Sequence, residues 1–274
     1  MKHLNLLFIG GMLWSSCSVG PQKTEPIQIE NSFVKSQLHT ENAVLWQQSA
    51  AEYKALCYQT YTLAKLQLEQ KLHAHAFPYE KKPAIVMDLD ETVVDNSFFN
   101  AQLLLDNEEY SKSKWKEWSD LEKAGAVPGA VDFIAFAQGK GVEVIFISNR
   151  RVSELQATKN NVEALGIVNI DSSHYYLRTE EGSKMNRRAK VSEDYEILML
   201  FGDNLADFNE VFDKRSNLDR NKLVHEMSKE FGATFIVLPN VLYGEWEGSL
   251  YAYKYHWTPA QKDSIRKTFV VGYK

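Results

Sequence analysis

The chain has 274 residues, of which 44% are hydrophobic, and this is enough apolar material for one large core with an insertion. Its formal net charge is -5 at pH 7, so it lacks the basic character expected of a protein that binds duplex nucleic acid. Any nucleotide that it recognises is therefore expected to be a small one.

The amino terminus has the layout of a secretory signal. An apolar stretch over residues 4–14 follows a basic start, is too short to span a membrane, and is followed by small residues and Cys17. This predicts a signal peptide over residues 1–16, cleavage before Cys17 and lipidation of that cysteine. Trp14 departs from the smaller residue usual at its position, and the alternative is a plain signal peptide with an incidental cysteine.

Residues 17–40 are polar and lack apolar periodicity, which predicts a tether between the lipid and a domain over residues 41–274. Ser18 does not resemble an inner-membrane retention signal, so we expect a lipoprotein of the cell envelope, in the outer membrane. Lipidation of Cys17 leaves Cys57 as the second of the two cysteines, and the mature chain then has no internal disulfide to form.

Apolar residues recur every three or four positions from Trp46 to Leu72, through Ala50, and predict one long amphipathic helix. Cys57 lies on its apolar stripe and is expected to be a core residue. A first strand opens after Pro83.

Three apolar runs end abruptly in polar residues, which is typical of buried parallel strands whose carboxyl ends form an active site. The polar residues are Asp88 and Asp90 after the first run, Ser148, Asn149 and Arg150 after the second, and Asp203 and Asp207 after the third. A single Asp-x-Asp is also common in solvated loops, but three such strand ends in one chain favour chemistry. Lys184 opens a polar helical stretch between the second and third runs.

The remaining segments predict an α/β fold. Residues 96–125 predict a small helical cap insertion over the carboxyl edge of the sheet, and residues 234–238 predict another strand. Crossover helices are expected over residues 131–138, 153–165 and 220–231. The expected architecture is a parallel sheet flanked by helices, with an amino-terminal helix and the cap.

The run from Asp88 to Asn96, together with the run from Gly202 to Phe208, resembles the two signatures of the class C acid phosphatases, which belong to the haloacid dehalogenase (HAD) superfamily and include bacterial lipoprotein 5′-nucleotidases. The resemblance extends from about Trp46 to Tyr253 and includes the lipid signal. One departure is Phe99, where the first signature of the family usually ends in tyrosine.

The resemblance implies a HAD-like Rossmannoid core and a role for each acidic residue. Asp88 would be the nucleophile that forms an aspartyl-phosphate and also a Mg²⁺ ligand, with Asp203 and the backbone carbonyl of Asp90 completing the protein's ligands. Oxygen ligands suit Mg²⁺. The side chain of Asp90 would be the general acid and then the base, and Asp207 would orient Lys184 or a metal-bound water.

The other polar residues would bind the phosphoryl group. Ser148 would hydrogen-bond a phosphoryl oxygen with help from the backbone amides of Asn149 and Arg150, and Lys184 would hold the charge of phosphate and nucleophile. Basic residues that crowd the same segment and could replace Lys184 are Arg187, Arg188 and Lys190.

Aromatic residues in the loop over 238–248 suit a substrate that carries a ring. Tyr243 and Trp246 are predicted to stack on a nucleobase, an interaction worth about 1 to 3 kcal/mol, or else to pin the loop onto the core. Rival stacking residues are Phe98, Phe99, Trp115 and Trp118.

These observations predict a Mg²⁺-dependent acid phosphatase, or 5′-nucleotidase, that hydrolyses small phosphomonoesters such as nucleoside monophosphates. One alternative is a phosphotransferase that passes the phosphoryl group to an alcohol. Another is a surface lipoprotein that binds haem or nicotinamide nucleotides, although retention of both Asp88 and Asp90 argues against it.

Overall fold

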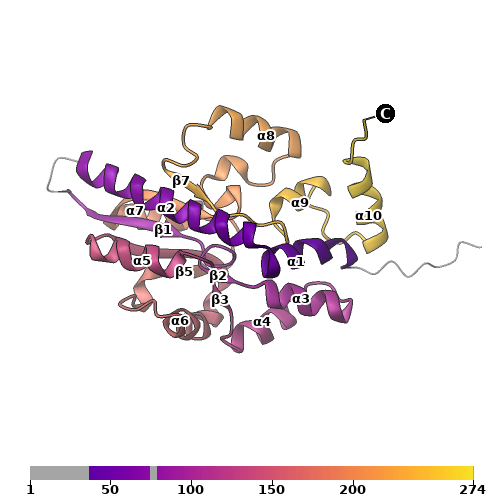
Figure 1. The fold of residues 1–274 in the computed structure, drawn as a ribbon, viewed down its shortest axis with the longest axis horizontal. Helices are drawn as coiled ribbons and strands as arrows, with labels where there is room; N and C mark the ends of the chain where they lie inside the picture. The colour runs from indigo at the N-terminus through magenta and orange to yellow at the C-terminus, as the bar shows by residue number, and fades with distance from the viewer. Residues whose placement is uncertain (1–36, 75–78, 274) are drawn as a thin grey trace, which may run out of the picture. The chain divides into compact units, whose positions relative to one another are not determined.

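A five-stranded parallel sheet lies at the centre of the computed structural model, which describes residues 37–74 and 79–273 (Figure 1). Its strand order is β5-β4-β1-β6-β7, so the strand that leads to Asp88 is central and the strands that lead to Ser148 and Asp203 lie on either side of it. The strands are β1 (Lys82–Met87), β4 (Glu143–Arg151), β5 (Tyr175–Arg178), β6 (Tyr195–Gly202) and β7 (Phe235–Val237). The predicted α/β fold is confirmed.

Both faces of the sheet are covered, which explains why its strands are continuously hydrophobic. Successive side chains of a strand point to opposite faces, and in β1 this sends Ile85 and Met87 to one core cluster and Ala84 and Val86 to the other. All four residues are buried. The sheet is therefore a rigid support for the loops at its carboxyl edge.

Helices α2 and α5 pack on each other and on one face of the sheet, and α7 packs against β6 from the other face (Figure 1). The α-helices outside the insertion are α1 (Glu41–Ser49), α2 (Ala51–Ala74), α5 (Ala130–Gly139), α6 (Leu155–Ala164), α7 (Met185–Asp194), α8 (Asn217–Glu226), α9 (Glu245–Leu250) and α10 (Pro259–Thr268). Cys57 of α2 is buried in the hydrophobic core, as predicted.

The prediction of one uninterrupted amino-terminal helix is wrong. Ala50 adopts an extended conformation with ψ of 128°, which separates α1 from α2. The break allows Trp46 of α1 to pack edge-on against Tyr53 of α2 with ring centroids 5.2 Å apart. The predicted helix over 220–231 is shifted as well, because α8 begins at Asn217, after Ser216 caps it through the amide of Asp219, and ends at Glu226.

The predicted cap insertion is helical and follows β1. It contains α3 (Ser97–Asp106) and α4 (Lys112–Asp120), and its ends are joined by a short antiparallel pair of β2 (Val94–Asp95) and β3 (Gly125–Ala126). Helix α4 begins where the hydroxyl of Ser111 accepts a hydrogen bond from the amide of Lys114. It packs on α6, which follows β4, so the insertion is tied to a second strand of the active-site edge.

The predicted signal peptide, Cys17 and residues 17–36 of the predicted tether lie outside the described residues. The last residues of that tether, Leu38–Thr40, form a 3-10 helix that leads into α1. Among the described helices, none combines the length and the apolar character that crossing a membrane requires.

Candidate active site

Three strand ends meet at the carboxyl edge of the sheet. Asp88 directly follows β1, and its amide donates a hydrogen bond to the carbonyl of Phe201, so the pairing of β1 with β6 continues to the start of the site. Asp203 directly follows β6, and Ser148 lies within β4. The register of the sheet thus brings together the acids and the serine that the sequence predicted.

Lys184 bridges two carboxylates inside the site. Its Nζ donates to Asp88 Oδ1 at 2.5 Å and lies 2.7 Å from Asp207 Oδ1. All three side chains are buried. Lys184 occupies the N-cap position of α7 and Asp207 ends the 3-10 helix Leu205–Asp207, so two separate segments place them. The ion pair places Asp207 where it can orient Lys184, and its role, toward Lys184 or a metal-bound water, stays a prediction.

Burial and charge together set the protonation of these groups. Burial lowers the pKa of the Lys184 ammonium, but the Asp207 and Asp88 carboxylates raise it above its ordinary value, so the lysine is a cation. Burial, opposed by Lys184 and reinforced by Asp207 and Asp90, raises the pKa of Asp88 to about 7. Burial and the carboxylates of Asp207 and Asp88 raise the pKa of Asp203 well above its usual range. With all three carboxylates ionised, the cluster would carry more negative charge than one lysine balances, which adds to burial in raising the pKa values of Asp88 and Asp203.

Asp203 is fixed through one oxygen only. Its Oδ2 accepts hydrogen bonds from Asn240 Nδ2 at 2.7 Å and from Asn204 Nδ2 at 3.0 Å. Within the described ranges, its Oδ1 accepts none. The carboxylate is therefore oriented by two amides and still offers a free oxygen to a ligand.

The carboxylates of Asp88, Asp203 and Asp207 form a plausible metal-binding cluster. Each offers an oxygen, and these oxygens lie within 4.8 Å of one another. Mg²⁺ binds oxygen ligands at about 2.1 Å, which places opposite ligands roughly 4.2 Å apart, so the set fits a small hard cation. Both oxygens of Asp207 already have partners in Lys184 and the amide of Asn204, which leaves Asp88 and Asp203 as the side chains best placed to bind it.

The side chain of Asp90 does not join this cluster. Its Oδ1 accepts hydrogen bonds from Arg150 NH2 at 2.8 Å and from Asn96 Nδ2 at 2.9 Å. The predicted metal contact of Asp90 through its backbone carbonyl stays a prediction. The guanidinium of Arg150 is buried against Asp90, so a direct contact of this side chain with substrate would require it to leave the carboxylate.

Ser148 is buried, and its Oγ accepts the amide of Arg150 at 3.1 Å, so its hydroxyl proton is available to a phosphoryl oxygen. Arg187 of α7 supports the carboxyl end of β4. Its guanidinium donates to the Ser148 carbonyl at 2.6 Å, to Asn149 Oδ1 at 2.7 Å and to the Ser183 carbonyl at 3.1 Å. One side chain therefore links this end of β4 to the loop that precedes Lys184.

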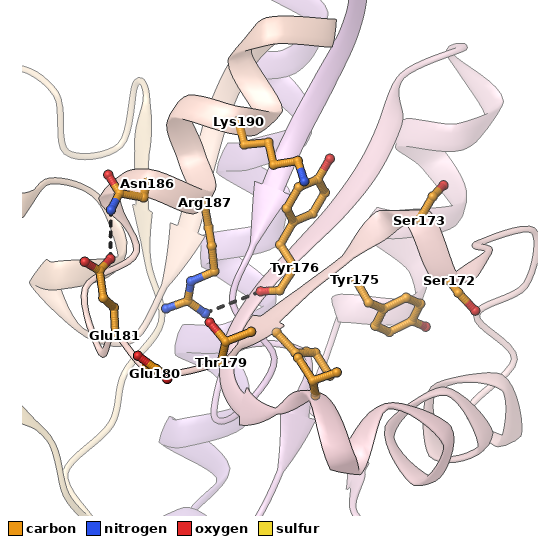
Figure 2. Close-up of a pocket in the computed structure, with 12 residues that line it drawn as sticks. Ser172, Ser173, Tyr175, Tyr176, Thr179, Glu180, Glu181, Asn186, Arg187 and Lys190 are labelled. Atoms are coloured by element: carbon orange, nitrogen blue, oxygen red, sulfur yellow. Dashed lines mark hydrogen bonds between the residues drawn. The ribbon is translucent and has the colours of Figure 1, made fainter.

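Arg187 also lines a groove of about 850 Å³ beside the edge strand β5. Figure 2 shows its guanidinium reaching from α7 toward the backbone of Tyr176, whose carbonyl it contacts at 3.4 Å. Lys190 lies on the same wall, whereas Arg188 is directed to Glu210 at 2.9 Å. Of the basic residues in this segment, Lys184 is the one that contacts Asp88.

Residues 14–246 match the family model described as HAD superfamily, subfamily IIIB (Acid phosphatase). The chain belongs to this acid phosphatase family. The class C acid phosphatase from Bacillus anthracis is 40% identical and superposes with a TM-score of 0.83, covering 88% of this chain and 100% of that one. Its structure with tungstate bound is 41% identical with a TM-score of 0.82, covering 88% of this chain and 99% of that one. The chain is thus a phosphomonoesterase, and its carboxylate cluster is that of a metal-dependent HAD phosphatase.

Tyr243 of this acid phosphatase points into the protein, because its hydroxyl donates to the buried Glu91 Oε2. Trp246 is 41% exposed, and its indole nitrogen donates to the Tyr243 carbonyl at 3.1 Å. Phe99 is buried and packs edge-on against Trp115, with centroids 5.2 Å apart. Stacking of a nucleobase on Tyr243 or Trp246 stays a prediction.

Four residues of the phosphatase site were not assigned functions from the sequence: Asn96, Glu91, Asn240 and Arg187. Glu91 is fully buried, and burial, together with Asp90 and Asp203, raises its pKa well above the usual range. It adopts a φ of 56°, which is uncommon for a residue other than glycine. Asn96 lies within the first signature, so a polar amide near the motif acids was the available signal. Asn240 lies in the loop over residues 238–248, where only the aromatic residues indicated a function. Arg187 was predicted only as a basic residue that could replace Lys184, and nothing in the sequence indicated its contacts with Ser148 and Asn149.

Proposed function

We propose that this acid phosphatase is Mg²⁺-dependent and hydrolyses nucleoside monophosphates through an aspartyl-phosphate on Asp88. The observation that carries the proposal is the contact of Asp88 with Lys184 beside two further carboxylates, because this pairs a nucleophile with a fixed cation and a metal site.

The first step forms a bond from an Asp88 oxygen to phosphorus and breaks the bond to the leaving-group oxygen. Lys184 holds Asp88 Oδ1 at 2.5 Å, so Oδ2 is the oxygen that is free to attack. The Ser148 hydroxyl donates to a phosphoryl oxygen. Like charges about 4 Å apart repel by roughly 1 kcal/mol in water and roughly 4 kcal/mol near a protein surface, and a bound Mg²⁺ would cancel this repulsion between carboxylate and phosphate.

Asp90 transfers one proton in each of the two steps, first as an acid and then as a base. As a carboxylic acid it donates its proton to the departing alkoxide, which leaves as an alcohol. The resulting carboxylate then accepts a proton from the water that attacks phosphorus, and the bond between phosphorus and Asp88 breaks to release phosphate. The 17% exposure of the Asp90 side chain, beside the buried nucleophile, agrees with contact to both substrate and water.

A nucleoside is the leaving group that we favour. Trp246 is 41% exposed and lies in the first turn of α9, directly after the loop that holds Asp203 through Asn240, so an aromatic surface lies next to the segment that shapes the site. Base stacking on such a ring contributes about 1 to 3 kcal/mol and tolerates any base. Tungstate in the Bacillus anthracis enzyme supports binding of a tetrahedral oxyanion by the related fold.

A panel of phosphomonoesters tests this proposal. The purified domain is assayed with AMP, glycerol phosphate and inosine monophosphate, with EDTA and after Mg²⁺ is added back. We expect activity to require the metal and kcat/KM to be higher for the nucleotides. A Trp246→Ala variant should lose about 5- to 160-fold in kcat/KM on nucleotides, which corresponds to the stacking energy above, and little on glycerol phosphate. Parallel losses on both substrates would contradict a base-binding role for Trp246.

We further propose that Cys17 carries the lipid that anchors the enzyme in the outer membrane. The support is the sequence pattern of the first 17 residues. Cys17→Ser should abolish incorporation of labelled palmitate and release the protein from the membrane fraction, because stable anchoring takes two or more lipid chains. Label that persists in the variant, or never enters the wild type, would contradict this assignment.

A further inference from the structure

The two carboxylate oxygens of Asp90 have unequal surroundings. Three donors converge on Oδ1: Arg150 Nε at 3.0 Å, Arg150 NH2 at 2.8 Å and Asn96 Nδ2 at 2.9 Å. In the described part of the chain, Oδ2 receives only the longer contact of Arg150 Nε at 3.3 Å. A carboxylic acid carries its proton on the oxygen that is not occupied by donors, so Oδ2 is the oxygen that exchanges a proton.

Asn96 can donate to Asp90 only if its amide is oriented correctly, and a cap residue sets that orientation. Trp118 Nε1 donates to Asn96 Oδ1 at 2.9 Å. An indole nitrogen is a donor only, so the amide oxygen must face Trp118 and the amide nitrogen must face Asp90. Asn96 is fully buried, and its backbone amide donates to Glu91 Oε1 at 2.8 Å, which holds the residue in place.

Arg150 is held by a second residue of α4, the helix that carries Trp118. The Trp115 ring lies 5.4 Å from the guanidinium carbon, in a cation–π arrangement, and Arg150 NH1 donates to Thr158 Oγ1 at 3.3 Å. The guanidinium is thus held between α6 and the cap, with its fork directed at Asp90. Trp115 and Trp118 are three residues apart in α4 and so lie on one face of that helix.

We propose that α4 of the cap positions the general acid. Trp118, through Asn96, and Trp115, through Arg150, anchor Asp90 Oδ1 and leave Oδ2 directed for proton transfer. The inference rests on the proposed acid role of Asp90. It assigns the two cap tryptophans to positioning of Asp90 instead of stacking on the substrate.

Trp118→Phe tests the inference with a small change, because it keeps an aromatic ring and removes the indole N–H. Proton donation matters for an alkoxide leaving group and little for nitrophenolate. We therefore expect a rise of about tenfold in the ratio of kcat/KM for p-nitrophenyl phosphate to kcat/KM for glycerol phosphate. This factor corresponds to the free energy of one hydrogen bond. Trp46→Phe is the matched control, since Trp46 packs on Tyr53 in α2, and its ratio should equal that of the wild type.

Arg150→Lys is a second variant in case Trp118→Phe is unstable by thermal unfolding. It keeps the charge but loses the planar fork, and the same ratio should rise. Parallel losses on both substrates in the two variants, or a ratio that stays at the wild-type value, would overturn the inference.

Asp90→Asn separates this inference from the proposed function. Equal losses on the two substrates in Asp90→Asn would refute the acid role itself. If Asp90→Asn is selective, adding Trp118→Phe to it should leave the ratio unchanged, because the residue to be positioned is already disabled. A further independent rise in the double variant would show that Trp118 acts elsewhere and would overturn the positioning role.

Discussion

Gly202 is the position where a single methyl group should damage the site most. A Cβ added there would lie 2.3 Å from Asp207 Oδ2 and 2.4 Å from Asp207 Cβ, both below the 3.0 Å limit of real Cβ contacts. Rotation of the Asp207 side chain cannot relieve the contact with its own Cβ, so the backbone of Leu205–Asp207 must move. That movement breaks the 2.7 Å pair with Lys184 and the 2.9 Å bond from the amide of Asn204.

The expected cost is large for stability and for catalysis. Leaving a buried charge without its partner costs about 3 to 5 kcal/mol, and a displacement of about 1 Å in a catalytic group costs on the order of a hundredfold in rate. Urea unfolding and kcat for p-nitrophenyl phosphate measure the two effects. Gly139→Ala is the control, since no atom lies within 4 Å of its added Cβ, and we expect about 0.4 to 1 kcal/mol of stabilisation. The reasoning is refuted if Gly202→Ala changes stability by less than about 1 kcal/mol and kcat by less than about threefold.

Three further changes test the supports of the site. In EDTA, folded Asp88 keeps its proton up to about pH 7 while the unfolded residue loses it near 3.8, so stability should fall as pH rises through this window. Asp88→Asn should make that fall smaller, as thermal unfolding at pH 4 and pH 8 would show, and the part that remains belongs to Asp203 and Glu91, whose pKa values are raised as well. Tyr61→Phe leaves the Thr92 carbonyl without its 2.6 Å buried donor and should cost about 1 to 3 kcal/mol in urea unfolding. Arg187→Lys keeps the charge but loses the planar guanidinium that donates to the Ser148 carbonyl at the end of β4, and kcat/KM should fall about tenfold, whereas Lys190→Ala should not change it.

The sequence predicted the acids of the site because each follows an apolar run, and the carboxyl ends of parallel strands meet at one edge. The rule alone is enough to predict Asp88, Ser148 and Asp203. Prediction of Lys184 also required the family resemblance, since Arg187 and Lys190 lie in the same segment and the local pattern does not show which of the three basic residues belongs to the site.

The partners that orient these residues could not be predicted in the same way. Asn240 reaches Asp203 across 37 residues, and Trp118 reaches Asn96 across 22, so packing of distant segments decides both contacts. Arg150 was predicted to help bind the phosphoryl group through its backbone amide, and nothing in the sequence indicated that its side chain is buried beside Asp90, because that position depends on α4 and α6. The break at Ala50 has no glycine or proline to mark it, and it accompanies the packing of Trp46 on Tyr53, a contact that local sequence pattern does not reveal.

Trapping of a phosphorylated Asp88 tests the central claim most directly. Asp90→Asn should still be phosphorylated by p-nitrophenyl phosphate, because nitrophenolate leaves without a proton, but the water step should be slow. We predict a burst of nitrophenol equal to the enzyme concentration and, after acid quench, phosphate on the peptide that contains Asp88. The additional change Asp88→Asn should abolish both signals. Turnover by Asp88→Asn at a substantial fraction of the wild-type rate, or phosphate found on another residue, would contradict the account.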